Sequence, residues 1–317
     1  MNKLFNKLAL LALLTTTVGI NSEAIGMEKN LAGIPESQKS HLQQSIIKLA
    51  VDQHEAYPLS VALIASAQHG DQANYHALLQ KVNTALAKGD KDDAYKAWML
   101  GRVLFAADSI HDRDTVRSSE RELAQLLTAA QLEKRDPASP EFAMLTWACA
   151  YYAGVSRHNF EHIRQPMLSA LSALEIAARQ DPSSHELASN AVWAAVMIAH
   201  ASAGVDNREV YDDTINRLKA IAGKDSVSGA LEATLTRTAD TSDYPAWAIG
   251  MLRVSAAAMR DTALDHELTQ PLNDAIRQAK DWGGQPNQTQ KNQWKASSEA
   301  VLGELSELLT RPVQTSS

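Results

Sequence analysis

Four tryptophans recur at nearly even spacing, and this repeat limits the possible folds more than any other feature of the sequence. Spacings of 49, 46 and 54 residues separate Trp98, Trp147, Trp193 and Trp247. About 25 residues after each tryptophan, a leucine stands in a second, more polar amphipathic segment: Leu123, Leu171, Leu218 and Leu272. Such helix pairs bury their apolar faces only by stacking on their neighbours. The pattern therefore predicts an all-α fold of stacked helical hairpins.

Local signals agree with this register. Apolar residues recur at spacings of three and four, and no alternating run is long enough for a sheet. Pro140 suits the first turn of a helix, and Ser183 with Glu186 fits a capping box. Helix stops are expected at Gly70, Gly154, Gly204 and Gly223. We expect about five helix pairs, the first over residues 57–88, preceded by a leading helix over 38–53 and followed by a closing helix over 289–310.

The N-terminus has the pattern of a secretory signal peptide. Lys3 and Lys7 precede an apolar run from Leu8 to Leu14, which fades toward Ala24. We expect cleavage after Ala24, no stable membrane insertion afterwards and a periplasmic or secreted location. The expected organisation is a signal peptide (1–24), a flexible segment (25–36), a helical-repeat domain (37–311) and a disordered tail (312–317). The single cysteine, Cys149, excludes an internal disulfide and predicts a buried, inert thiol.

Charge and missing motifs narrow the function. The net charge of -7, with 30 basic and 37 acidic residues, argues against a nucleic-acid partner, because polyphosphate binding needs a concentrated basic surface. The sequence has no Gly-rich phosphate loop, no G-x-S-x-G elbow and no Cys-His pairing typical of a nucleophile. These observations favour a non-enzymatic protein and no cofactor. An exported all-α hydrolase or lyase remains the alternative.

Several segments resemble tetratricopeptide repeats. They are the Asp-Pro-x-Ser linkers at 136–139 and 181–184, the Ala-Tyr-Tyr-x-Gly stretch at 150–154 and Ala-Trp-Met-Leu-Gly at 97–101. The resemblance covers residues 57–282, in units longer than the 34 residues of that family. It implies a degenerate tetratricopeptide-like α-solenoid that binds a protein or peptide partner, mainly on a concave face.

The loops that join the two helices of each hairpin give the candidate binding surface. In a stacked solenoid, the loops at 110–114, 155–162, 205–208 and 261–266 should lie along one edge. That edge would concentrate imidazole and guanidinium groups, which can engage carboxylates and respond to pH. The candidate residues are His111, Asp112, Arg157, His158, His162, Arg208 and His266. The simpler interpretation is an inert solvated edge.

One string within these loops also fits a metal site. His158-Asn-Phe-Glu-His162 has the H-x-x-E-H pattern, in which two imidazoles could bind zinc and Glu161 could activate a water. The competing interpretation is a solvated hairpin loop anchored by Phe160, and zinc stays the weaker hypothesis. His200 and the four repeat tryptophans are expected in the core.

Overall fold

The computed structural model describes residues 56–68, 70–88, 92–235 and 244–283. Within these ranges the chain forms eleven α-helices, one short 3-10 helix and no strand, as the sequence predicts. The helices are α4 Ala56–Gln68, α5 Gln72–Ala87, α6 Asp93–Ser109, α7 Arg113–Ala130, η1 Leu132–Lys134, α8 Pro140–Val155, α9 Arg157–Gln180, α10 His185–Gly204, α11 Arg208–Ala222, α12 Val227–Leu235, α13 Tyr244–Met259 and α14 Thr262–Gly283. The predicted signal peptide, flexible segment, leading helix, closing helix and tail lie outside the described residues.

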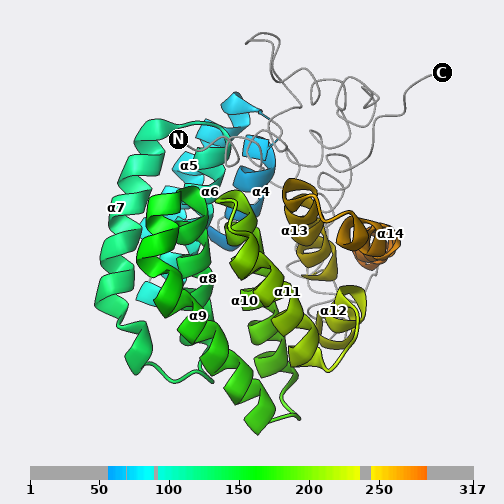
Figure 1. The fold of residues 1–317 in the computed structure, drawn as a ribbon. Helices are drawn as coiled ribbons and strands as arrows, with labels where there is room; N and C mark the ends of the chain where they lie inside the picture. The colour runs from blue at the N-terminus through cyan, green and yellow to red at the C-terminus, as the bar shows by residue number, and fades with distance from the viewer. Residues whose placement is uncertain (1–55, 69, 89–91, 236–243, 284–317) are drawn as a thin grey trace, which may run out of the picture.

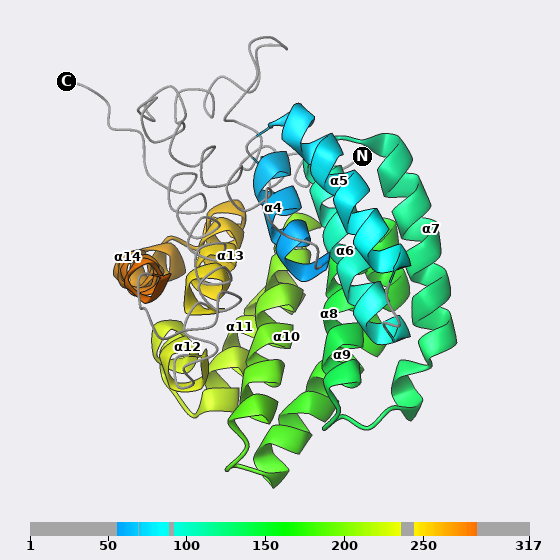
Figure 2. The same cartoon turned by 180° about the vertical axis from the view of Figure 1, so that it is seen from behind.

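The helices form two layers. In the inner layer, α4, α6, α8, α10 and α13 contact one another in that order. Each inner helix also packs against the helix that follows its hairpin turn, so α5, α7, α9, α11 and α14 form the outer layer (Figures 1 and 2). The short α12 bridges α11 to α13 and α14. The chain therefore builds five helix pairs within the described ranges.

The inner layer is the apolar core of the fold. In α10, every residue from Ala191 to Ala199 is buried. This helix is also the one described segment long and apolar enough to cross a membrane, but 83% of its apolar window lies inside the fold. That burial is typical of a core helix in a packed protein.

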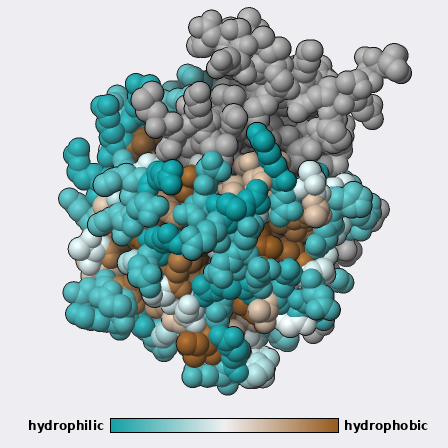
Figure 3. Space-filling model, in the orientation of Figure 1, coloured by the Kyte–Doolittle hydropathy of each residue, from teal (hydrophilic) through white to brown (hydrophobic). Residues whose placement is uncertain are grey.

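The outer helices are amphipathic, and their buried positions follow the sequence repeat. The four leucines predicted from the repeat are all fully buried: Leu123, Leu171, Leu218 and Leu272. Val82, at the equivalent position of α5, is fully buried as well. The opposite faces of these helices carry mostly polar side chains, and the face seen in Figure 3 is largely hydrophilic. Each outer helix thus closes its own section of the core.

Four hairpins turn in the same way. The first helix ends on a residue with positive φ, and the next residue caps the second helix through its side chain. The cap amide donates to a carbonyl five residues back, at 2.8–2.9 Å, which is the pattern of a Schellman turn. The caps are Asp71, Asp112, Asn207 and Asp261.

The register of these turns is constant. In the first, second, fourth and fifth hairpins the capping residue follows an inner-layer aromatic by 14 residues and precedes a buried outer-layer aliphatic by 11. The aromatics are Tyr57, Trp98, Trp193 and Trp247, and the aliphatics are Val82, Leu123, Leu218 and Leu272. The described helices therefore repeat one hairpin design.

The third hairpin departs from this design and corrects one prediction. Its cap, Ser156, follows Trp147 by only nine residues and precedes Leu171 by 15, so the turn comes about one helical turn earlier in the sequence. Ser156 directly follows α8 and has extended backbone, so no positive-φ residue is needed. Residues 157–162 were predicted as loop, but they form the first turns of α9.

Two further predictions need correction. Ser184, not Ser183, caps α10, because the Ser183 hydroxyl donates to the Asp181 carboxylate at 2.6 Å and leaves Ser184 Oγ to accept from Leu187 N.

The burial of the repeat tryptophans is the second correction. Trp193 and Trp247 are buried as predicted, each 8% exposed. The other two repeat tryptophans pack against the core but are only partly buried. Pro140 starts α8 behind the cap Ser139, as predicted.

Candidate functional site

The predicted edge exists as a geometric feature. The turns that follow α4, α6, α8, α10 and α13 lie at one end of the helices, and Figures 1 and 2 agree on this placement. We call the segments 110–114, 155–162, 205–208 and 260–266 the turn edge. Exposed side chains on it are His111, Arg157, His158, Glu161, His162, Arg208 and His266, while Asp112 is partly buried.

Hydrogen bonds join neighbouring turns and make the edge a continuous structure. Tyr75 Oη donates to Asp112 at 3.1 Å, and Tyr211 Oη donates to Asp261 at 3.4 Å. Burial, and then the nearby carboxylate, raise the pKa of both tyrosines, so each phenol keeps its proton. Asn159 Nδ2 donates to Glu120 at 2.6 Å and links the second turn to the third.

Two of the candidate residues already have structural partners. Asp112 caps α7 and accepts from Thr115 and Tyr75. Burial alone would raise the pKa of Asp112, but these hydrogen bonds outweigh it and lower the pKa below its usual value. Arg208 donates to the Met259 carbonyl, pairs with Asp212 at 3.5 Å and lies over the Tyr211 ring. Both residues chiefly hold the edge together.

The remaining candidates are free to contact another molecule. Within the described chain, the side chains of His111, Arg157, His158, His162 and His266 have no hydrogen bond or ion pair. They come from three separate hairpins, so they form a line of exposed basic and imidazole groups rather than one enclosed cluster. These side chains are therefore available for surface contacts.

Non-glycine residues with positive φ at the turn edge reduce the stability of the fold. Gly70 has φ 70° in the first turn, but the same position is held by His111 at 61°, Asp206 at 58° and Arg260 at 55°. A side chain in this left-handed region costs roughly 1 kcal/mol relative to glycine. Glycine would therefore be the more stable choice at all three positions.

The H-x-x-E-H string lies on the exposed side of α9. His158 and His162 are one helical turn apart, so they could share a face, and Glu161 is also exposed. No group of three or more His, Cys, Asp or Glu residues is arranged to hold a metal ion in the described part of the chain. A zinc site there would lack a third protein ligand from these residues.

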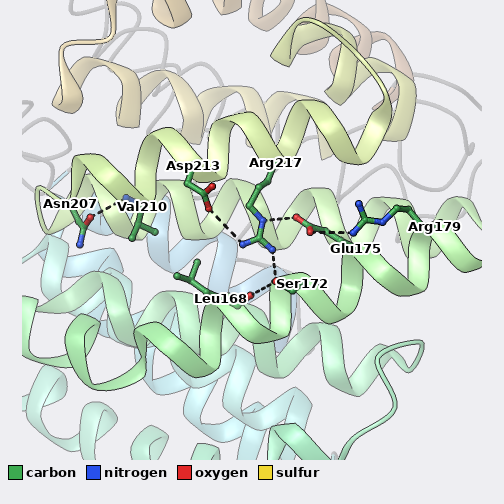
Figure 4. A network of polar contacts seen from close by, with 8 residues as sticks. All are labelled: Leu168, Ser172, Glu175, Arg179, Asn207, Val210, Asp213 and Arg217. Carbon is green, nitrogen blue, oxygen red and sulfur yellow. Dashed lines mark hydrogen bonds and ion pairs between the residues drawn. The ribbon is translucent and has the colours of Figure 1, made fainter.

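A polar network behind the edge fixes α9 against α11. Arg217 reaches across from α11, with Nε 2.7 Å from Glu175 and Nη2 2.8 Å from Ser172 (Figure 4). Glu175 also pairs with Arg179 at 3.7 Å, and Arg217 with Asp213 at 3.8 Å. Every member has a structural partner, so this network stabilises the helix pair and carries no chemistry of its own.

The interior holds a second polar feature that the sequence analysis missed. Arg102 of α6 is only 1% exposed, yet it lies among aromatic rings from three inner helices. Its guanidinium carbon is 4.2 Å from the ring centre of Trp247, 4.9 Å from Tyr57 and 5.8 Å from Trp98. The contact with Trp247 joins α6 to α13 across the inner layer. Side chains therefore occupy space that an open solenoid would leave as a concave groove.

The polar atoms of this cluster are incompletely paired. Arg102 Nε donates to Ser60 Oγ at 2.7 Å, and Nη1 reaches Tyr151 Oη at 3.5 Å, but Nη2 has no partner within the described ranges. Trp147 Nε1, which is also buried, has no acceptor among these residues either. Each such donor costs about 1–3 kcal/mol, which stacking on the rings offsets only in part. One feature of the sequence could have revealed this buried arginine. Arg102 stands four residues after Trp98, whereas the residues four positions after the other repeat tryptophans are uncharged: Tyr151, Met197 and Met251.

A pair of partly buried carboxyl groups, Asp108 and Glu120, lies where the second and third hairpins meet. Burial, and then the charge of Glu120, raise the pKa of Asp108 to about 7. The Oδ2 atom of Asp108 is buried and has no hydrogen-bond partner among the described residues. The same glutamate contributes to the raised pKa of Tyr152, after burial. Asp108 is therefore a proton-binding group close to neutral pH.

His200 is an interior imidazole, as predicted. Its Nδ1 lies 2.9 Å from Ser255 Oγ, and its ring contacts Phe105 at 5.6 Å. Burial lowers the pKa of His200 to about 4, so the ring is neutral at pH 7. Ser255 is fully buried and donates to the Met251 carbonyl, which leaves its hydroxyl unsuited to attack a substrate. Burial raises the pKa of Cys149 to about 12, as an inert thiol requires.

Comparisons with known proteins give no relative: no family model, no curated protein and no solved structure matches this chain.

Proposed function

We propose that the chain is an exported, non-enzymatic helical-repeat protein that binds a protein or peptide partner through its turn edge. The main support is the set of non-glycine residues in left-handed backbone at that edge. His111, Asp206 and Arg260 each keep an exposed side chain at a positive φ, where glycine would stabilise the fold. Backbone strain that recurs at equivalent positions of an exposed edge is typical of a surface that binds another molecule.

The chemistry of the edge favours a partner with acidic groups. Arg157, His158 and His162 extend from the start of α9 without intramolecular ion pairs in the described chain. Guanidinium groups bind carboxylates through paired hydrogen bonds, and histidines add charge as the pH falls. The degenerate tetratricopeptide-like character of the repeat and the signal-peptide pattern are part of this proposal.

Site-specific cross-linking tests the proposal. A photoreactive amino acid is placed at Arg157 or at His158, in cells that naturally produce the protein. Matched controls place it at Glu133 or at Asp136, two exposed residues between α7 and α8, and Figure 1 shows this connection at the opposite end of the helices. We expect a discrete cross-linked product from the edge positions only. Equal products from both ends, or none from the edge, would contradict the proposal.

A glycine substitution separates binding from stability. His111→Gly should raise the free energy of unfolding by about 1 kcal/mol, because glycine adopts φ 61° without strain. The same change should weaken the cross-link from Arg157 if His111 contributes to the contact surface. A variant that is more stable but cross-links with unchanged yield would show that His111 is not part of the contact surface.

A further inference from the structure

In the part of the chain that the structure describes, the interior cluster around Arg102 has hydrogen-bond donors but no negative charge to pair with them. We propose that it is a binding site for a small organic carboxylate with a flat apolar body, distinct from the turn edge. Arg102 takes part in no ion pair within the described chain, and its Nη2 is unpartnered.

Two other arginines, one buried and one partly buried, show which kind of partner Arg102 lacks. Arg253 is 2% exposed, and its Nη1 has no hydrogen-bond partner among the described residues, but its Nε lies 2.8 Å from the Asp265 carboxylate. Arg217 is paired with Glu175 and Asp213. A buried guanidinium normally has such an acidic partner, because an unpaired charge in the interior is strongly disfavoured. Among these three arginines, only Arg102 has aromatic faces and hydroxyl groups in place of a carboxylate.

The geometry of the guanidinium defines the ligand. Ser60 Oγ takes the Nε hydrogen, and this leaves the edge formed by Nη1 and Nη2, where the sole partner is Tyr151 Oη at 3.5 Å. Two terminal nitrogens in one plane match the two oxygens of a carboxylate. Trp147 Nε1 is a second unpartnered donor on the helix that carries Tyr151. Arg102 Nη2 and Trp147 Nε1 are thus donors without an acceptor among the described residues, and an anionic group rich in acceptor oxygens would complement them.

The surroundings define the rest of the ligand. The Trp98 and Trp147 rings contact each other at 5.3 Å, and both are only partly buried, so the aromatic wall extends from Arg102 toward the surface. Aromatic faces of this kind bind flat apolar groups. A small carboxylate suits the site better than a polypeptide chain, because Arg102 itself is 1% exposed.

Ligand titration of the whole protein tests the proposal. Benzoate, its neutral isostere benzamide, acetate and chloride are titrated at constant ionic strength, with tryptophan fluorescence and melting temperature as readouts. We expect saturable fluorescence change and a higher melting temperature with benzoate, and at least tenfold weaker binding of the other three. A peptide ending in phenylalanine, with a free or an amidated C-terminus, identifies whether a chain end can supply the carboxylate. Equal responses to benzoate and benzamide, or to benzoate and chloride, would overturn the proposal.

Variants assign the effect to Arg102. Arg102→Lys keeps the charge but loses the paired nitrogens, so benzoate affinity should fall at least tenfold while circular dichroism is unchanged. Arg253→Lys is the matched control at a buried arginine that already has its carboxylate, and it should bind benzoate like the wild type. Tyr151→Phe removes the weak partner of Nη1 and should leave affinity equal or higher. Undiminished binding by Arg102→Lys would refute the assignment, and if that variant fails to fold, the benzoate and benzamide comparison on the wild type decides.

Discussion

Replacing Asp108 by asparagine should stabilise the protein, and the gain should grow with pH. The pKa of Asp108 is raised from 3.8 to about 7, so the folded protein holds a proton that the unfolded chain releases between these values. The contribution of Asp108 to the stability of the wild type therefore falls as the pH rises from about 4 to 7. A shift of this size corresponds to about 4 kcal/mol at pH 8, and we expect about 2–4 kcal/mol because the carboxyl group is partly solvated. Asparagine keeps the size of the side chain and removes the charge near Glu120.

Urea unfolding at pH 5, 6, 7 and 8 measures the effect. The difference between Asp108→Asn and wild type should be smallest at pH 5, where the unfolded carboxyl group has already lost its proton but the folded one keeps it, and largest at pH 8. His200 titrates in the opposite sense but is present in both proteins, so its contribution cancels from the difference. Glu133→Gln, at an exposed position, should change stability by less than about 0.5 kcal/mol at every pH. A variant that is no more stable at pH 8, or whose gain does not depend on pH, would refute the reasoning.

Three further outcomes can be measured in the same unfolding assay. Trp193→Ala should lower the free energy of unfolding by about 3–5 kcal/mol, because the Trp193 side chain is buried and its ring centre lies 5.8 Å from that of Trp247. An unchanged melting temperature would show that Trp193 is not a core residue. The lowered pKa of His200 means that its contribution to stability is present above pH 6.5 and is lost as the pH falls toward 4. The difference in stability between His200→Gln and wild type should therefore move by up to about 3 kcal/mol in favour of the variant over that range, and a difference that does not change with pH would contradict this. Arg217→Met should lower the free energy of unfolding by about 2–3 kcal/mol, because Glu175 loses its 2.7 Å partner. An unchanged free energy of unfolding would show that the network is dispensable.

Much of the local structure could be predicted from the sequence, because it depends on residues close together in the chain. Helix stops at Gly70, Gly204 and Gly223, the start of α8 at Pro140 and the buried leucines of the outer helices all follow from capping and from 3.6-residue periodicity. The edge location of the turns follows from stacking alone. The stop expected at Gly154 also lies within one residue of the end of α8, but the loop expected over residues 155–162 was too long, because α9 begins at Arg157 directly after the cap Ser156.

The interior could not be predicted in the same way. Arg102 is surrounded by Tyr57, Tyr151 and Trp247, which lie 45, 49 and 145 residues away in the sequence. Periodicity shows that these residues face inward, but it does not show that α6 and α13 meet across the inner layer. The contact of Arg208 with the Met259 carbonyl likewise depends on which hairpins are neighbours, so the roles of the edge residues could not be separated from sequence alone.

The contact between Arg102 and Trp247 changes how the repeats should unfold. In an open array each hairpin touches only its neighbours, so terminal units fray first and unfolding spreads inward step by step. Here α6, from the second hairpin, also contacts α13, from the fifth, so losing the last hairpin removes contacts from the second as well. The described hairpins should therefore exchange their amide hydrogens as one cooperative unit, with similar protection in α6 and α13 despite their distance along the chain.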